Sequence, residues 1–456
     1  MASSKNHKLK VFFFPFLATG HILPMANLAR LFSDRGINST IITTPANSTL
    51  LHLPSSVNLL LLPFPPTSET NLPVNCENTA SLPNSNPNSS HISNLFKAIE
   101  LLRKPFTDLL QQHQPDFLIS DWVYSWTADL AQSLGIPRLT FQTCSAFCNV
   151  ICNQIHEHKP HLGINGLMPF QVHGVGHRIE MVKGELPVVF DHPFVFDMFR
   201  DAEMKSYGTI MNSFYELEPL YVDFLRATRK LWCVGPVGFG DNQQVEKIKK
   251  WLDSKDPDSV IYVCFGSECT VSAYQINEMA RGLEASGHPF IWVLRIDDIV
   301  LPSGFEARME MGESKGLVLR GWAPQAMILR HPSVGGFMTH CGWNSILEGV
   351  SAGLPMAAWP LQSEQFINEK MVVEVLEIGV KVLRAVGDVV DEEIVRKSVE
   401  LLMGGEQQSL EMRMRAKEYQ AKARAVMEKG GASYEDLSHL IEEMEEYAKK
   451  RKMGGG

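Results

Sequence analysis

The chain has 456 residues, of which 45% are hydrophobic and 20% charged, and its net charge is −9. This length favours two domains of about 200 residues each, and the composition is that of a globular protein rather than a disordered or fibrous one. The negative charge argues against a nucleic-acid partner, which normally requires a basic face.

The sequence also bears on the cellular compartment. No stretch reaches the roughly 18 apolar residues that a membrane-spanning helix needs, and the first residues show no cleavage-site pattern. The 8 cysteines form no recognisable disulfide framework. We therefore expect a cytoplasmic protein without a membrane span, and we expect it to be a monomer.

Strand and helix patterns alternate through the first half of the chain. Residues 8–16 predict a buried strand, and "ILPMANLARLFSDRG" predicts an amphipathic helix that ends at Gly36. Further strands are predicted at "NSTIITT", "VNLLLLPFP", "DFLISD" and "PRLTF". Residues 71–93 are rich in Pro, Asn and Ser and predict a long loop, which leads into one helix over residues 93–112. This alternation is typical of βαβ units in an open parallel sheet.

The alternation restarts after "VGPVGFGDNQQ", the candidate linker. Strands are predicted at "SVIYVCFGS", "PFIWVLR", "GLVLRGW", "VGGFMTH" and "LPMAAWP". We expect two Rossmann-like, doubly wound α/β domains that face each other across a cleft. In such sheets ligands bind at the carboxyl ends of the strands, so functional residues should lie in the turns that follow strands.

Two of these turns in the first half carry residues suited to acid–base chemistry. His21 follows the first predicted strand, and Asp121 ends "DFLISD". A single histidine in such a turn is commonly structural, but a carboxylate that orients the imidazole makes it a good general base. Asp121 belongs to the same predicted sheet, although the sequence does not show whether the two residues touch.

The segment "FMTHCGWNSILEGVSAG", residues 337–353, forms a strand-to-helix corner that permits two interpretations. His340 beside Cys341 suggests a thiol nucleophile, whereas Asn344 and Ser345 at the start of a helix suggest a seat for an anion. Neighbouring residues on a strand point to opposite faces, which argues against proton exchange between His340 and Cys341. We therefore favour the anion site over a thiol hydrolase.

Other turns of the second half suggest a nucleotide and a sugar. Trp322 offers a flat face to a base, Gln325 and Glu348 can bond ribose hydroxyls, and Glu364 and Gln365 can bind another polyol. Neither GxGxxG nor GxxxxGK[ST] is present, which weakens the NAD and ATP interpretations.

From Trp322 to Gln365 the sequence resembles, nearly position for position, the signature of plant secondary-product glycosyltransferases. "GHILP" and "MNSFYELEP" resemble other landmarks of the same proteins, so the chain is identified as a member of the plant UDP-dependent (family 1) glycosyltransferases. The resemblance implies the GT-B fold, with an acceptor-binding domain over residues 1–240 and a UDP-sugar-binding domain over residues 241–433. A C-terminal helix at about residues 434–452 is expected to pack back on the first domain.

The resemblance also implies a role for each matched residue. His21 is implied as the catalytic base and Asp121 as its partner. The implied UDP-binding residues are Ser267, Trp322, Ala323, Gln325, His340, Asn344, Ser345 and Glu348. The implied sugar-binding residues are Thr143, Trp343, Glu364 and Gln365. No metal and no cofactor besides the donor substrate are implied.

The implied activity is inverting, metal-independent transfer of glucose from UDP-glucose to a hydroxyl of a small hydrophobic plant metabolite: a flavonoid, another phenolic, a triterpenoid or a steroid. Gln365 favours glucose over galactose. Transfer from UDP-rhamnose, UDP-xylose or UDP-galactose stays open, as does a catalytically silent nucleotide-sugar-binding protein, although the presence of both His21 and Asp121 argues against silence. Four aromatic residues are candidates either for the acceptor pocket or for core packing: Phe14, Phe16, Phe147 and Phe194.

Overall fold

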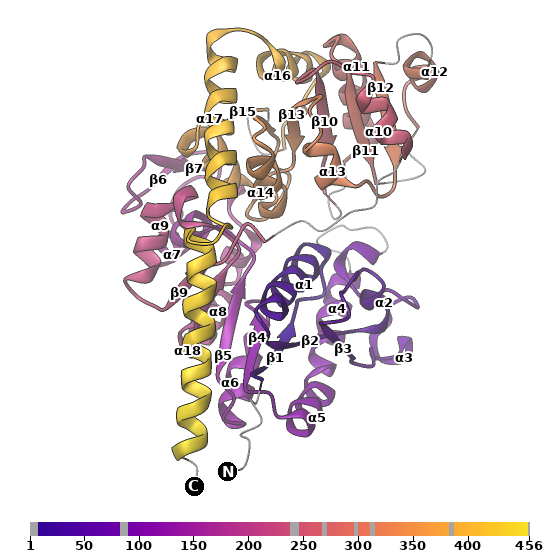
Figure 1. Cartoon of the computed structure of the whole chain (residues 1–456). Coiled ribbons are helices and arrows are strands. Elements are labelled where there is room, and N and C mark those ends of the chain that lie inside the picture. Colours follow the sequence, from indigo (N-terminus) through magenta and orange to yellow (C-terminus); the bar gives the residue numbers. More distant parts are fainter. Residues whose placement is uncertain are drawn as a thin grey trace.

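The computed structural model of the chain describes residues 8–82, 90–237, 246–266, 271–295, 300–310, 315–382 and 387–454. Two parallel sheets, each covered by helices, lie one above the other (Figure 1). Of the site residues expected from the sequence, Ser267 lies outside the described residues.

The first sheet has the strand order β3-β2-β1-β4-β5-β8-β9, and all its pairings are parallel. Its strands are β1 (Lys10–Phe14), β2 (Asn38–Thr43), β3 (Asn58–Leu61), β4 (Phe117–Asp121), β5 (Arg138–Gln142), β8 (Gly208–Met211) and β9 (Leu231–Cys233). The helices of this half are α1 (Thr19–Asp34), α2 (Pro45–Ser48), α3 (Thr67–Thr70), α4 (Ser90–Leu101), α5 (Arg103–His113), α6 (Trp126–Ser133), α7 (Ala146–His158), α8 (Pro193–Met204) and α9 (Pro219–Arg226). A small antiparallel ribbon, β6 (Phe170–Val172) with β7 (Ile179–Met181), stands apart from the sheet.

The second sheet has the order β12-β11-β10-β13-β14-β15, again with parallel pairing throughout. Its strands are β10 (Val260–Cys264), β11 (Phe290–Leu294), β12 (Gly316–Arg320), β13 (Val334–Thr339), β14 (Met356–Ala358) and β15 (Gly379–Lys381). Its helices are α10 (Glu246–Asp253), α11 (Ala273–Ala285), α12 (Phe305–Glu310), α13 (Gln325–Leu329), α14 (Trp343–Ala352), α15 (Gln365–Lys370), α16 (Glu392–Met403) and α17 (Gln407–Ala425). The two doubly wound domains predicted from the alternating pattern are therefore present.

The predicted helix over residues 93–112 is wrong in one respect, because the structure breaks it into α4 and α5 at Leu102. Pro105 explains the break. Proline lacks the N–H that a continuous helix would donate to the carbonyl of Leu101, and its ring collides with that carbonyl. The loop predicted over residues 71–93 also ends early, since α4 begins at Ser90.

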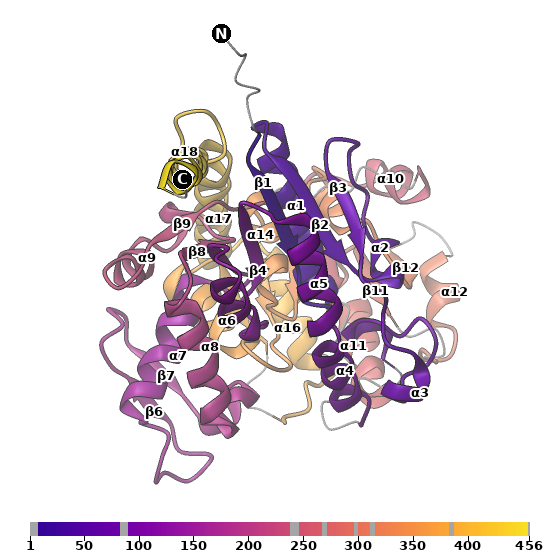
Figure 2. The same cartoon turned by 90° about the horizontal axis from the view of Figure 1, so that it is seen from below.

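The last helix, α18 (Ala432–Gly454), runs beside the first sheet, whereas α17 runs beside the second domain (Figure 1). Viewed from below, α18 stands at the β9 edge (Figure 2). Its apolar residues join the core that also holds β1 and α1; they are Leu437, Leu440, Ile441 and Met444. Asp436 accepts a hydrogen bond from the main-chain N–H of Cys233 at 2.7 Å, and Glu443 accepts one from the Tyr207 hydroxyl at 2.7 Å.

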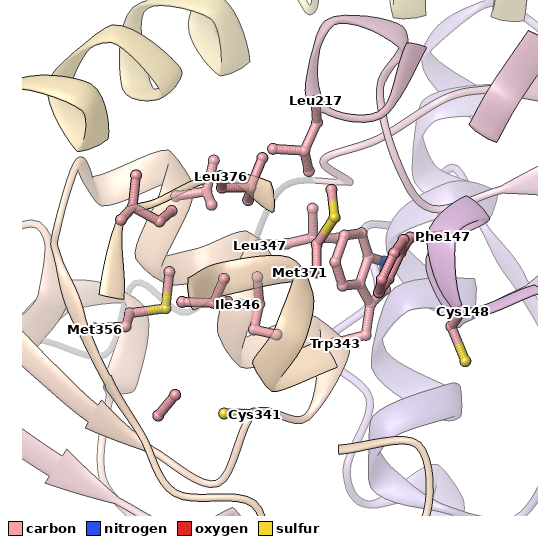
Figure 3. Packing of buried hydrophobic residues seen from close by; sticks show 14 of the residues in the cluster. Phe147, Cys148, Leu217, Cys341, Trp343, Ile346, Leu347, Met356, Met371 and Leu376 are labelled. Carbon is pink, nitrogen blue, oxygen red and sulfur yellow. The ribbon is translucent and has the colours of Figure 1, made fainter. Parts of the chain in front are cut away.

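One apolar cluster crosses from the first domain to the second. Phe147 of α7 lies against Trp343 of α14, with Leu217, Leu347 and Met371 around them (Figure 3). All five side chains are buried. Because this cluster joins the domains at the starts of α7 and α14, it places those two helix ends close to each other. Within the described residues, no helix is both long and apolar enough to cross a membrane.

Candidate active site

The topology explains why His21 and Asp121 meet. β1 and β4 are neighbours in the sheet, and Phe14 is in register with Ser120. The chain leaves β1 into α1 and arrives at β4 from the other side of the sheet, so the carboxyl ends of these two strands form the switch point at which ligands bind in such sheets. His21 lies in the first turn of α1, and Asp121 is the last residue of β4.

The two side chains are in direct contact. His21 Nδ1 lies 2.8 Å from Asp121 Oδ2, with the carboxylate fully buried and the imidazole 21% exposed. Asp121 Oδ1 accepts a hydrogen bond from the main-chain N–H of Val123 at 3.1 Å. Since an ionised carboxylate only accepts, the proton of the neutral imidazole is assigned to Nδ1. Nε2 then carries the lone pair, on the side of the ring away from Asp121.

A buried arginine, which was not among the residues predicted from the sequence, forms hydrogen bonds to the end of β4 at Ser120 and Asp121. Arg138 donates from Nη2 to the main-chain oxygen of Asp121 at 3.3 Å and from Nε to Ser120 Oγ at 2.7 Å. Burial lowers the pKa of this guanidinium to about 10, while the charges of Glu203 and Asp121 act in the opposite direction. The group stays a cation at neutral pH and lies against the main chain of Asp121.

The residues expected to bind the nucleoside gather after β12 and along α14. The Trp322 side chain is 52% exposed, as a stacking face must be, whereas Ala323 is buried. Gln325 Nε2 donates to Ser345 Oγ at 3.1 Å and also to Glu348 Oε2. Burial raises the pKa of Glu348 to about 7, and the hydrogen bond from Gln325 partly offsets this. Because this pKa lies near 7, a hydroxyl that donates a hydrogen bond to the Glu348 carboxylate favours its ionised form.

His340 stands between two glycines. A Cβ atom added at Gly266 would lie 2.7 Å from the imidazole ring, and one at Gly342 would lie 2.5 Å from it. Desolvation and, to a smaller extent, the charge of Arg295 lower the pKa of His340 to about 4. The ring is therefore neutral at physiological pH. Its Nδ1 is buried and has no hydrogen-bond partner among the residues described.

The start of α14 meets the start of α1. Gly342 precedes α14 and provides no side-chain cap, so the first N–H groups of this helix can serve an anion. Asn344 donates from Nδ2 to the carbonyl of Gly20, one residue before the imidazole, at 2.6 Å. Its Oδ1 accepts from Asn212 Nδ2 at 3.4 Å. The Asn344 amide thus bridges the domains, and its predicted phosphate contact stays a prediction.

The indole of Trp343 is buried between the two domains. Its Nε1 donates to the main-chain oxygen of Asn212 at 2.8 Å, and the residue is only 2% exposed. The ring belongs to the interdomain cluster with Phe147 (Figure 3). This placement leaves the main-chain N–H of Trp343 as the group suited to the predicted sugar contact.

Cys341 is a packing residue in this structure. It is fully buried, and burial raises the pKa of its thiol well above the usual value. Its carbonyl accepts a hydrogen bond from Asn368 Nδ2 at 3.0 Å, and its φ of 65° lies in the left-handed region, which turns the chain from β13 into α14. A thiolate nucleophile has no support here, in line with the interpretation of this corner as an anion site.

The sugar-side candidates lie at the start of α15. Gln365 is buried, and its Oε1 accepts from the main-chain N–H groups of Leu361 and Gln362 at 2.9 and 3.0 Å. This fixes the amide so that Nε2 is its donating end. Glu364 is half-buried at the cap position of the same helix. Thr143, the remaining sugar candidate, instead lies in the first domain, 3.2 Å from His21 Nδ1.

Two residues of "MNSFYELEP" have structural roles that spacing alone did not reveal. Asn212 accepts a hydrogen bond from the Trp343 indole through its main-chain oxygen and donates one from Nδ2 to Asn344. Glu218 accepts from the main-chain N–H groups of Ala146 and Phe147 at 3.0 and 2.8 Å, and so caps α7. Burial raises the pKa of Glu218 to about 7. The sequence signal was the motif itself, whose polar residues stand directly after a strand.

Of the aromatic acceptor candidates, Phe14 and Phe147 are fully buried core residues. Phe16 packs edge-on against His21 with ring centroids 5.4 Å apart, and Phe194 is 78% exposed on α8. In the part of the chain that the structure describes, no group of three or more His, Cys, Asp or Glu side chains is arranged to hold a metal ion.

Comparison with known proteins shows what the chain is similar to. Residues 239–396 match the family model described as "UDP-glucoronosyl and UDP-glucosyl transferase". The chain is 39% identical to an anthocyanin 3'-O-beta-glucosyltransferase of Gentiana triflora, over 96% of this chain and 99% of that protein. It is 38% identical to a scopoletin glucosyltransferase of Nicotiana tabacum, over 97% and 99% of the two chains.

Solved structures show the same similarity. The crystal structure of Glycyrrhiza uralensis UGT73P12 with glycyrrhetinic acid 3-O-monoglucuronide superposes with a TM-score of 0.89, at 36% identity over 98% of both chains. Phytolacca americana UGT2, complexed with UDP-2fluoro-glucose and pterostilbene, gives a TM-score of 0.81 at 28% identity over 96% of this chain and 100% of that one. The chain therefore belongs to the plant family 1 UDP-glycosyltransferases and has their GT-B fold, as its sequence predicted.

Proposed function

We propose that this UDP-glycosyltransferase transfers glucose from UDP-glucose to a hydroxyl of a small hydrophobic plant metabolite, with inversion and without a metal, using His21 as the general base. The observation that carries the proposal is the contact of 2.8 Å between His21 Nδ1 and the buried carboxylate of Asp121. A protein that only bound a nucleotide sugar would have no need of this pair.

The chemistry follows from the orientation of the imidazole. Nε2 takes the proton of the acceptor hydroxyl as its oxygen attacks the anomeric carbon, and the imidazolium that forms is stabilised by Asp121. The attack comes from the first domain, opposite the bond to UDP held by the second, and displacement from the opposite face inverts the anomeric configuration. The leaving diphosphate gains charge, which the N–H groups that follow Trp343 in the first turn of α14 stabilise.

The donor contacts are proposed residue by residue. Trp322 stacks on uracil, with the main chain of Ala323 at the base edge, and the Gln325–Glu348 pair receives the ribose. His340, Asn344, Ser345 and the sequence-matched Ser267 face the diphosphate. Glu364, Gln365 and the Trp343 main chain face the sugar. Gln365 favours UDP-glucose over UDP-galactose as donor.

The acceptor class is proposed from the relatives, whose names cover an anthocyanin, scopoletin and a flavonoid. A mass-spectrometric screen tests the activity: UDP-glucose, UDP-galactose, UDP-xylose and UDP-rhamnose against scopoletin, quercetin, pterostilbene and glycyrrhetinic acid, with and without EDTA. We expect glucose transfer that EDTA does not reduce, and a β-linked product by proton NMR.

His21→Ala tests the mechanism. We expect transfer to be lost while the dissociation constant for UDP-glucose stays within about twofold, because the base touches the acceptor and not the nucleotide. Turnover equal to that of the native enzyme would contradict the role of His21.

A further inference from the structure

Besides Asp121, a second polar group contacts the imidazole of His21: the hydroxyl of Thr143, which is itself bonded to Trp122. These two residues are called the polar arm. Thr143 Oγ1 lies 3.2 Å from His21 Nδ1, and Trp122 Nε1 donates to the same Thr143 oxygen at 3.3 Å. Thr143 is 6% exposed and follows β5, while Trp122 follows β4 and sits next to Asp121 in the chain. Two neighbouring strand ends thus place one hydroxyl and one indole beside the proposed base.

The hydrogen-bond roles are fixed by what each group can do. The indole N–H only donates, so Thr143 Oγ1 accepts from Trp122. In the tautomer with the proton on Nδ1, this N–H forms a bifurcated hydrogen bond. Its shorter branch goes to Asp121 Oδ2 and its longer branch to Thr143 Oγ1. The Thr143 hydroxyl proton has no lone pair to approach on Nδ1 and points away from the imidazole. The arm is therefore compatible with the base-competent tautomer.

The arm also restricts the ring. The bond to Asp121 fixes the distance between Nδ1 and Oδ2, but small rotations about the Cα–Cβ and Cβ–Cγ bonds of His21 still change the direction of Nε2. A second oxygen on the same nitrogen, together with the edge of Phe16 at 5.4 Å between ring centroids, restricts these rotations. Holding a reacting group in one orientation is worth a substantial part of a catalytic barrier, so the direction of Nε2 matters.

Trp122 is itself held from outside the site. Its ring meets that of Phe199 edge to face at 5.1 Å, and Phe199 belongs to α8. The end of α8 is anchored to the sheet by Arg138, which donates to the carbonyl of Ala202 at 3.3 Å and to Oγ of Ser206, just after the helix. The contacts run in order from α8 through Trp122 and Thr143 to His21.

We infer that Trp122 and Thr143 are positioning residues for His21, with Trp122 acting through Thr143, and that the main task of the Thr143 hydroxyl is to hold the base rather than the sugar. This inference rests on the proposed role of His21. It differs from the expectation drawn from the sequence, in which Thr143 contacts the sugar, and the two roles lead to different kinetics.

The test compares Thr143→Val, Thr143→Ser, Trp122→Phe and the double variant Trp122→Phe/Thr143→Val. Each is assayed for kcat and for the KM of UDP-glucose, with the best acceptor among scopoletin, quercetin, pterostilbene and glycyrrhetinic acid. Trp126→Phe is the matched control: Trp126 is in the same domain, and among the described residues its Nε1 has no hydrogen-bond partner.

We expect Thr143→Val to lower kcat about tenfold, the order of one lost hydrogen bond, while the KM of UDP-glucose changes less than about twofold. Thr143→Ser should restore kcat. Trp122→Phe should lower kcat several-fold, Trp126→Phe should not, and the double variant should be no worse than Thr143→Val, because residues that act through one another are not additive.

Three results would overturn the inference. A rise in the KM of UDP-glucose at unchanged kcat in Thr143→Val would make Thr143 a sugar contact. Multiplying effects in the double variant would show that Trp122 acts independently of Thr143. Equal kcat in Trp122→Phe and Trp126→Phe would leave Trp122 without a role. His21→Ala, assayed alongside, separates failure of the proposed base from failure of this inference. If His21→Ala stays active, the proposed base is wrong. If it is inactive, the results for the Thr143 and Trp122 variants bear on the positioning role alone.

Discussion

The replacement of Asp121 by asparagine probes the proposed mechanism most directly, because the structure dictates how the amide would sit. Oδ1 of Asp121 accepts the main-chain N–H of Val123 at 3.1 Å, so the amide oxygen of asparagine must occupy this place. The amide NH₂ then takes the position of Oδ2, 2.8 Å from His21 Nδ1. Since NH₂ only donates, it drives the imidazole proton from Nδ1 to Nε2 and removes the lone pair that receives the acceptor proton.

The size of the effect can be bracketed. A hydrogen bond to a charged group is worth about 1.5–3 kcal/mol, which corresponds to about 10- to 150-fold in rate. The attraction between imidazolium and carboxylate at 2.8 Å has an upper bound of about 6 kcal/mol at an effective dielectric constant of about 20, or about 10⁴-fold. The same substitution in a Ser-His-Asp protease costs about 10⁴-fold. We expect kcat to fall by about 10²- to 10⁴-fold.

The assay follows UDP release under saturating UDP-glucose and acceptor. Titration calorimetry with UDP-glucose should give an unchanged dissociation constant, and circular dichroism should show a native fold. A kcat within threefold of that of the native enzyme, in a folded Asp121→Asn protein, would refute the assignment of His21 and Asp121 as a catalytic pair.

Three further predictions concern the nucleotide site, the thiol and the last helix. The proposed contact with ribose hydroxyls favours the ionised form of Glu348, whose pKa burial raises to about 7, so UDP should bind more tightly as the pH rises from 6 to 8. Calorimetry of Glu348→Gln should show this pH dependence abolished, and equal slopes in the two proteins would contradict the contact. Cys341→Ser should keep activity within about threefold, because a buried thiol of raised pKa supplies no thiolate, and complete loss in a folded protein would revive the nucleophile. Leu440→Ala should lower the free energy of unfolding by about 3 kcal/mol in urea titrations, whereas the exposed Leu410→Ala should change it by less than about 0.5 kcal/mol; equal effects would contradict the packing of α18.

Much of the fold could be read from the sequence because parallel α/β domains are built from local patterns. Buried strands appear as continuous apolar runs, helices as amphipathic repeats, and both were found in the predicted order. The exception, the break between α4 and α5, has a local cause as well, since Pro105 cannot continue the hydrogen-bond ladder. The helical pattern on both sides of Pro105 favoured one continuous helix, and the pattern alone did not reveal that the proline would interrupt it.

The candidate site was predictable only as a set of turns. His21, Asp121 and the α14 corner were recognised because their residue types follow strands, and the family resemblance supplied their roles. Their contacts depend on strand order, which periodicity does not encode. The 2.8 Å bond exists because β4 crosses over to lie beside β1.

Sequence by itself determined the class of the protein, its two sheets and the residue types available for chemistry, because propensity and apolar periodicity act over short distances. Only the tertiary structure decided how those residues are used. Trp343, expected at the sugar, has its indole in the interdomain core because Phe147 and the carbonyl of Asn212 meet it there. Thr143 lies against His21, and Arg138 contacts the main chain of Asp121. These placements follow from packing between strands and domains far apart in the chain, and no local pattern contains them.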